Sequence, residues 1–157
     1  MITYREASST DLESICALGN EVNAIHHTAW PQIFAPNGSI ERDQAFWAKS
    51  IETPGNAAFL AEQAGQIIGF ITITLVDETG SLMQTMRYGR LGSVCVTASH
   101  QGQGVGRTLL AMAEQWAASH SAVDIRLQVW SFNERAVALY EELGYSIRSH
   151  ILGKRLS

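Results

Sequence analysis

Length, composition and charge predict one compact domain over residues 1–157. The 157 residues include 46% hydrophobic and 17% charged side chains, and a chain of this size buries about 70% of the surface that its unfolded form exposes. The net charge of −4, from 15 acidic and 11 basic residues, argues against a partner such as nucleic acid that is bound through overall charge.

The first third of the chain predicts a strand followed by two helices. Ile2–Ala7 alternates polar and apolar residues and predicts the strand. Thr10 and Glu13 form a capping-box pattern for a helix that runs to about His27. A less periodic segment with several aromatic residues follows, and Ser39 then caps a second helix that continues to about Ile51.

The middle of the chain predicts a hairpin and a third strand beside it. Strands are expected at Ala57–Gln63 and Gln66–Val76, and the tight turn between them falls at Ala64 and Gly65. Asp77–Met86 is predicted to be a loop, and Tyr88–Thr97 predicts the next strand. Strands joined in this way give an antiparallel front half.

The last third alternates helices and strands. Apolar residues at helical spacing from Val105 to Trp116 predict a helix, and Asp124–Trp130 is rich in strand-forming residues. Another helix is expected from Glu134 to Leu143, with Gly144 at the left-handed position that ends it. Two short final strands are expected at Tyr145–Arg148 and Ile151–Leu156.

A glycine-rich turn, Gln101–Gly106, lies between the strand that ends near Thr97 and the helix that begins near Gly104. This arrangement places backbone N–H groups at the positive end of a helix, where an anionic phosphate is stabilised. A Walker loop is excluded because Arg107 stands where lysine is required. The dinucleotide fingerprint fails because its third glycine is missing.

Two motifs resemble one known family. The turn reads Gln-Gly-Gln-Gly-Val-Gly and is similar to the acetyl-coenzyme A signature of the GCN5-related N-acetyltransferase (GNAT) family, Gln/Arg-x-x-Gly-x-Gly/Ala. Further on, Asn133 and Ala136 precede Tyr140, Gly144 and Tyr145 in a pattern that resembles the family's later motif. The resemblance implies an α/β (α+β) single domain. Its mixed, mostly antiparallel central sheet would be splayed at the cofactor site and flanked by helices.

The resemblance also implies acetyl-CoA as cosubstrate, without a metal. The pyrophosphate would lie on the turn amides, and the peptide-like pantetheine arm would pair with the Val94–Val96 strand segment. An unpaired N–H in the opening between strands would polarise the thioester carbonyl. Arg107 and Arg135 are both candidates for the remaining phosphate. The expected cofactor-binding residues are Val94, Cys95, Val96, Gln101, Gly102, Gln103, Gly104, Val105, Gly106, Arg107, Asn133 and Tyr140.

The reaction implied by the resemblance is direct acetyl transfer to a primary amine of a small molecule, peptide or protein. Tyr140 is the expected catalytic acid, because a tyrosine hydroxyl with a pKa of about 10 stays protonated at neutral pH and can donate to a departing thiolate, whose pKa is near 8.5. Ser93 stands near the position where many relatives carry an acidic residue. The proton acceptor therefore stays open among a water chain and four side chains: Glu21, His26, His27 and Glu62.

The acceptor, the partners and the location are expected as follows. In the family the acceptor lies against the first two helices and their loop, so Trp30 and Phe34 are the expected substrate-binding residues, with Phe46 and Trp47 nearby. A homodimer is a further option, and a noncatalytic CoA-binding or sensing domain is the alternative function. Two widely spaced cysteines, no apparent leader and no long apolar run predict a cytoplasmic protein without a membrane partner.

The net charge is divided unevenly along the chain. Residues 1–80 carry −7 and residues 81–157 carry +3. The basic half contains the turn expected to bind the anionic coenzyme, and the acidic half contains the segment expected to bind the amine. This division predicts an acidic acceptor site.

Overall fold

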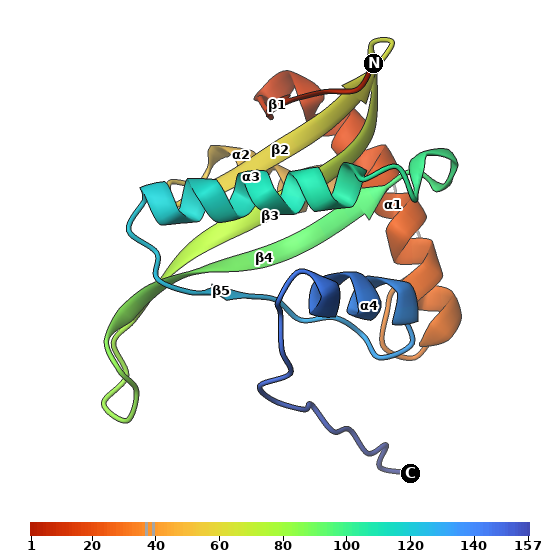
Figure 1. The fold of residues 1–157 in the computed structure, drawn as a ribbon. Coiled ribbons are helices and arrows are strands. Elements are labelled where there is room, and N and C mark those ends of the chain that lie inside the picture. The colour runs from red at the N-terminus through yellow and green to blue at the C-terminus, as the bar shows by residue number, and fades with distance from the viewer. Residues whose placement is uncertain (37, 39) are drawn as a thin grey trace.

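A five-stranded sheet in the order β1-β2-β3-β4-β5 forms the centre of the molecule (Figure 1). The computed structural model describes residues 1–36, 38 and 40–157. The first four strands are antiparallel neighbours, and β5 pairs with β4 in the parallel direction. The strands are β1 (Thr3–Glu6), β2 (Asn56–Gln63), β3 (Gln66–Glu78), β4 (Met86–Val96) and β5 (Ile125–Arg126).

Helices cover both faces of this sheet. On one face, α1 (Leu12–Ala29) and α2 (Ile40–Glu52) close a core around Ile15, Leu60 and Phe70. On the other face, α3 (Val105–Ser119) covers a core that includes Ile71 and Leu109, and residues of α4 (Glu134–Glu142) pack against its margin. Short 3-10 turns, η1 and η2, occupy Ser9–Asp11 and Ala98–His100. The predicted mixed α/β fold with a mostly antiparallel sheet is confirmed.

The hairpin between β2 and β3 forms as predicted. Ala64 and Gly65 both have positive φ, at 51° and 77°, as in the primed turns that match the twist of a two-residue hairpin. The predicted loop after it is shorter than expected, because β3 continues to Glu78 and β4 already begins at Met86. Ladder pairing of β3 with β4 extends both strands.

The start of α1 corrects the predicted capping box. Asp11, not Thr10, is the N-cap of α1. The capping box lies one turn earlier, around η1, where the N–H of its N-cap Ser8 donates to Asp11 Oδ2 at 2.8 Å. Arg5 from β1 donates two hydrogen bonds to the same carboxylate, each of 2.8 Å. The hydrogen bond from Arg5 is the main reason that the pKa of Asp11 is lowered to about 2. The predicted cap of α2, Ser39, lies outside the described residues.

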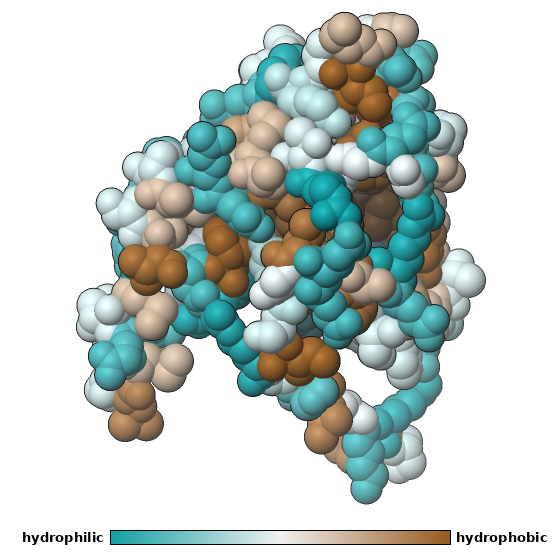
Figure 2. Space-filling model, viewed as in Figure 1, coloured by the Kyte–Doolittle hydropathy of each residue, from teal (hydrophilic) through white to brown (hydrophobic). Residues whose placement is uncertain are grey.

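The predicted strands after α3 are largely wrong. Only Ile125 and Arg126 of the expected strand Asp124–Trp130 pair with β4, and neither Tyr145–Arg148 nor Ile151–Leu156 forms a strand. An alternating pattern becomes a strand only where a neighbouring strand supplies hydrogen bonds. In the described part of the chain, no strand lies beside the residues after Arg126 to supply them. Figure 2 shows apolar side chains along this C-terminal tail, where Leu152 is 91% exposed.

Within the described ranges, no helix combines the length and apolar character that a bilayer crossing requires.

Candidate active site

The sheet opens between β4 and β5. Their pairing ends at Arg90 and Arg126, although β4 continues to Val96 and keeps its pairing with β3. The N–H groups of Ser93 and Thr97 point toward β3, where they donate to Thr72 Oγ1 and Ile68 O at 2.9 Å each. Because backbone groups alternate sides along a strand, those of Val94 and Val96 face the opening.

A β-bulge shapes the middle of β4. The register with β3 shifts between Ile71 and Ile73, so Gly92 and Ser93 both stand opposite Thr72. The Thr72 hydroxyl accepts the Ser93 N–H that the bulge displaces from the ladder. A Cβ at Gly92 would lie only 2.6 Å from this hydroxyl, which explains glycine at that position. The bulge therefore depends on the pair Thr72 and Gly92.

The glycine-rich turn leads directly from the end of β4 to α3. Gly102 and Gly104 have φ of 80° and 81°, a region that L side chains rarely adopt. Gly104 is the N-cap of α3 and supplies no side-chain cap. No described residue accepts a hydrogen bond from the amides of Gln101–Gly106. These amides and the helix dipole together form a site for an anion.

Two arginines lie near this turn, with different partners. Arg135 of α4 donates to Gln101 Oε1 at 2.9 Å, and its second terminal nitrogen would lie 3.3 Å from a Cβ on Gly102. Arg107 is paired instead with Glu142 at 3.0 Å on the exposed surface. Arg135 is thus the cation at the turn itself. The expected cofactor-binding residues include Arg107 but not Arg135.

The predicted acid, Tyr140, lies on α4. The helix begins at Asn133, whose Oδ1 accepts the Ala136 N–H at 3.4 Å, so Asn133 acts at least as a cap. Burial, and to a smaller extent the neighbouring Cys95 thiol, raises the pKa of Tyr140 to about 12. No described side chain or backbone group hydrogen-bonds its hydroxyl. The neighbouring Tyr145, by contrast, donates to Glu114 Oε1 at 2.6 Å.

The candidate proton acceptors are scattered. Glu62 on β2 pairs with Arg5, away from the opening, and both histidine rings bond backbone carbonyls through Nδ1. Burial, and to a smaller extent the charge of Glu21 on α1, raises the pKa of the Cys95 thiol on β4 to about 12. Glu21 is therefore the candidate whose charge acts on a residue of β4. A thiol with that pKa is not a nucleophile at neutral pH. No three His, Cys, Asp or Glu side chains in the described ranges are grouped as metal ligands.

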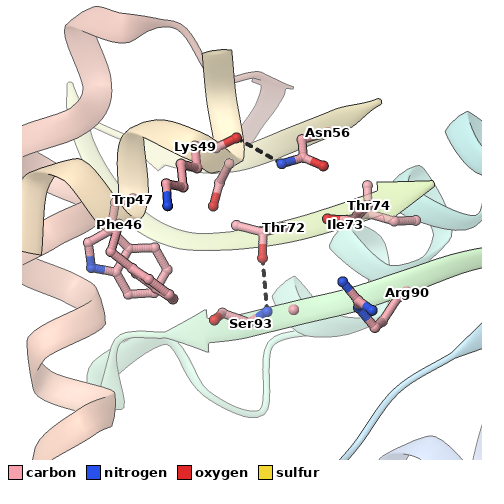
Figure 3. A pocket seen from close by; sticks show the side chains of 11 residues that line it. Phe46, Trp47, Lys49, Asn56, Thr72, Ile73, Thr74, Arg90 and Ser93 are labelled. Atoms are coloured by element: carbon pink, nitrogen blue, oxygen red, sulfur yellow. Dashed lines mark hydrogen bonds between the residues drawn. The ribbon is translucent and has the colours of Figure 1, made fainter. Parts of the chain in front are cut away.

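A cavity of about 320 Å³ lies between α2 and the adjacent face of β3 and β4 (Figure 3). We call it the α2 cavity. Phe46 and Trp47 form one wall, and Lys49 and Arg90 reach toward the space from opposite sides. The other lining residues are Ser50, Asn56, Thr72, Ile73, Thr74, Gly92 and Ser93. The prediction of an acidic acceptor site does not describe this cavity, because its only charged lining residues in the described ranges are cations.

The predicted acceptor residues Trp30 and Phe34 lie elsewhere, in a cluster of aromatic rings. The Phe34 ring centroid is 4.9 Å from that of Trp130 and 5.0 Å from that of His26. Trp30 also approaches Trp130, at 6.3 Å. These contacts hold the segment after α1 against the residues that follow β5. Neither Trp30 nor Phe34 lines the α2 cavity, and their role in acceptor binding stays a prediction.

The open edge of β4 leads directly into the glycine-rich start of α3, so unpaired strand groups and turn amides lie in one continuous row. The family model described as "Acetyltransferase (GNAT) family" matches residues 21–145. The chain belongs to this family.

Individual relatives agree with this assignment. The uncharacterized N-acetyltransferase YhfO of Bacillus subtilis is 27% identical over 144 residues, which cover 92% of this chain and 89% of YhfO. Other curated relatives are longer, and the chain spans 29% to 52% of the length of several N-acetyltransferase 8 proteins and mycothiol acetyltransferases.

Solved structures share the fold. A single-site mutant of the BH1408 protein from Bacillus halodurans superposes with a TM-score of 0.88 at 24% identity, covering 99% of each chain. Aminoglycoside N-acetyltransferase AAC(6')-Iy, solved in complex with CoA, has a TM-score of 0.77 at 17% identity. The superposition covers 99% of this chain and 95% of the AAC(6')-Iy chain.

Proposed function

We propose that this protein transfers the acetyl group of acetyl-CoA directly to a primary amine. The observation that carries the proposal is the open edge of β4, because it runs without interruption into the unpartnered amides of the glycine-rich turn. One extended ligand can therefore occupy both, with pantetheine along Val94 and Val96 and pyrophosphate at Gln101–Gly106. Arg135 would add a cation beside the phosphates, and AAC(6')-Iy shows that a protein of this fold binds CoA.

The proposed reaction requires little covalent chemistry from the protein. The amine nitrogen attacks the thioester carbonyl carbon, the C–N bond forms, and the C–S bond breaks to release the thiolate. Tyr140, whose raised pKa of about 12 keeps its hydroxyl protonated at neutral pH, donates its proton to that thiolate and regains a proton from water. A backbone N–H facing the opening, from Val94 or Val96, would polarise the carbonyl. The new amide loses its extra proton to water or to Glu21.

Replacing Tyr140 by Phe tests this assignment. The variant should lower kcat by roughly 10²–10⁴-fold, the usual range for a lost general acid. Its dissociation constant for acetyl-CoA, measured by calorimetry, should stay close to that of the wild type. Tyr145→Phe is the matched control, because it also removes one tyrosine hydroxyl. The Tyr145 ring lies 5.8 Å from that of Tyr140, but its hydroxyl donates to Glu114. If both variants kept the wild-type kcat, Tyr140 would not be the acid.

A noncatalytic CoA-binding or sensing domain is the second candidate. It is favoured by the absence of a carboxylate among the described residues that line the α2 cavity, including Ser93. The two functions differ in one observable, the release of free CoA from acetyl-CoA in the presence of amines. Tight CoA binding without amine-dependent CoA release, over polyamines, amino acids, aminoglycosides and peptides, would favour the sensing domain.

We also propose a homodimer and a cytoplasmic location. Four large apolar side chains of the C-terminal tail are between 67% and 91% exposed, and a second copy would cover them: Ile147, Ile151, Leu152 and Leu156. Light scattering should then give twice the monomer mass, and a monomer at micromolar concentration would contradict the dimer. The two free, buried thiols favour a reducing compartment.

A further inference from the structure

We propose that the acceptor amine also carries an anionic group, a carboxylate or a phosphate, and that Arg90 and Lys49 bind this group in the α2 cavity. This inference rests on the proposed acetyl transfer, and it narrows the acceptor to small amino acids or amino phosphates. It departs from the acidic acceptor site that the charge of the first half of the chain predicts.

The first observation is that Arg90 is unpaired. Within the described part of residues 1–144, it is the one arginine whose guanidinium has neither a hydrogen-bond nor an ion-pair partner. A guanidinium presents several N–H donors in a planar fork that matches a carboxylate or a phosphate. The other arginines in this range each reach a carboxylate or an amide oxygen: Arg5, Arg42, Arg87, Arg107, Arg126 and Arg135.

The second observation is the charge of the cavity wall. Lys49 of α2 extends toward the same space as Arg90 (Figure 3), and its ammonium has no described partner. No carboxylate of the described residues lines the cavity to balance the two cations. Two like charges that share a concave site repel each other, and an anion between them removes that cost.

Neutral donors complete the site. The Thr72 oxygen accepts the Ser93 N–H, so the Thr72 hydroxyl proton is available to a ligand. Ser93 and Thr74 also line the cavity, and no described residue bonds their hydroxyls. Phe46 is 64% exposed and packs edge-on against Trp47 at 4.9 Å, which leaves an apolar surface for the carbon skeleton of the acceptor. The cavity wall thus offers hydrogen-bond donors for the anionic group and an apolar surface for the hydrocarbon part of the acceptor.

The cavity adjoins the opening for the coenzyme. A second hollow lies between β4 and the segment Arg126–Gln128, and Arg90 and Gly92 line both hollows. Arg90 is also the last residue of β4 that pairs with β5. An anionic group held by Arg90 would therefore keep the rest of a small acceptor beside the place where the thioester is expected. The location gives Arg90 a specificity role that its surface exposure alone would not indicate.

Matched acceptors test the inference by activity. Amino acids are compared with their amides, which keep the amine and lose the negative charge, and aminoalkyl phosphates form a third arm. The wild type should show kcat/KM at least about tenfold higher for one of the two anionic series, since a charge-assisted hydrogen bond is worth one to two orders of magnitude. The series with the higher value identifies the anion. Amides that react as well as both anionic series would overturn the inference.

Variants separate binding by Arg90 from a general effect of charge. Arg90→Gln and Lys49→Gln should each bring the ratio of kcat/KM for the anionic acceptor to kcat/KM for its amide close to one. Neither variant should change the affinity for acetyl-CoA. Arg87→Gln is the control, because Arg87 lies on the same strand but pairs with Asp77 outside the cavity. It should keep the full preference. An unchanged preference in Arg90→Gln, or an equal loss in Arg87→Gln, would refute the role of Arg90.

A binding readout keeps the two proposals distinguishable. Acetate and inorganic phosphate are titrated into protein saturated with CoA, so that the glycine-rich turn is already occupied, and backbone amide shifts are followed by NMR. Shifts at Arg90 and Ser93 that disappear in Arg90→Gln would support the anion site even if no amine were acetylated. Acetylation without these shifts and without a preference would leave the proposed function intact and overturn the anion site.

Discussion

Gly104→Ala isolates the contribution of the glycine-rich turn. Gly104 has φ of 81°, and no atom lies within 4 Å of an added Cβ, so the substitution creates strain without a clash inside the protein. Holding alanine in the left-handed region costs about 1–2 kcal/mol. For a domain of this size, that loss lowers Tm by about 2–8 °C.

The effect on the coenzyme should be larger than strain alone explains. A methyl group at the N-cap of α3 would obstruct the approach of a phosphate to the turn amides, and losing one amide–phosphate hydrogen bond costs about 1.5–3 kcal/mol. The dissociation constant for CoA, measured by calorimetry, should therefore rise by roughly 10- to 100-fold.

Gly144→Ala is the matched control for this prediction. Gly144 follows α4, has φ of 96°, and likewise has no atom within 4 Å of an added Cβ. The two variants should lose similar stability, but Gly144→Ala should keep the wild-type affinity for CoA. The reasoning is refuted if Gly104→Ala binds CoA like the wild type, or if both variants lose affinity equally.

Three further substitutions test other parts of the account. Thr72→Val leaves a bulge N–H without its acceptor and should cost about 1–3 kcal/mol in urea unfolding, whereas Thr74→Val should cost under about 0.5 kcal/mol; equal costs would contradict the bulge. Asp11, with a pKa lowered from 3.8 to about 2, stabilises the fold above pH 4 by up to about 2 kcal/mol, and this is lost as pH falls through 2. Asp11→Asn should remove that pH dependence from the unfolding free energy, and an unchanged slope would refute it. Arg135→Gln should weaken CoA binding several-fold more than Arg107→Gln, and equal losses would contradict the placement of Arg135 at the turn.

The sequence predicted the elements whose partners are close along the chain. The β2–β3 hairpin depends on a local turn at Ala64 and Gly65. The helix α3 depends on one apolar side, which packs against the strands that precede it in the chain. The Gln101–Gly106 turn was predicted for the same reason, since its glycines and the helix after it are contiguous. Local pattern and local geometry agree in these elements.

Features that depend on distant contacts were not predictable in this way. The expected strand Asp124–Trp130 shrinks to two residues because β4 and β5 diverge, and no residue-by-residue pattern encodes that divergence. Arg90 and Lys49 line one cavity although they lie on different elements. The available signal for Arg90 was an arginine in mid-strand, followed to the end of its strand only by small or apolar residues.

A crystal structure of the protein with CoA tests the central claim most directly. We predict pantetheine along the open edge of β4 at Val94 and Val96, pyrophosphate on the amides of Gln101–Gly106, and the Tyr140 hydroxyl about 3 Å from the sulfur. CoA bound away from the opening between β4 and β5, or a sulfur beyond the reach of Tyr140, would contradict it.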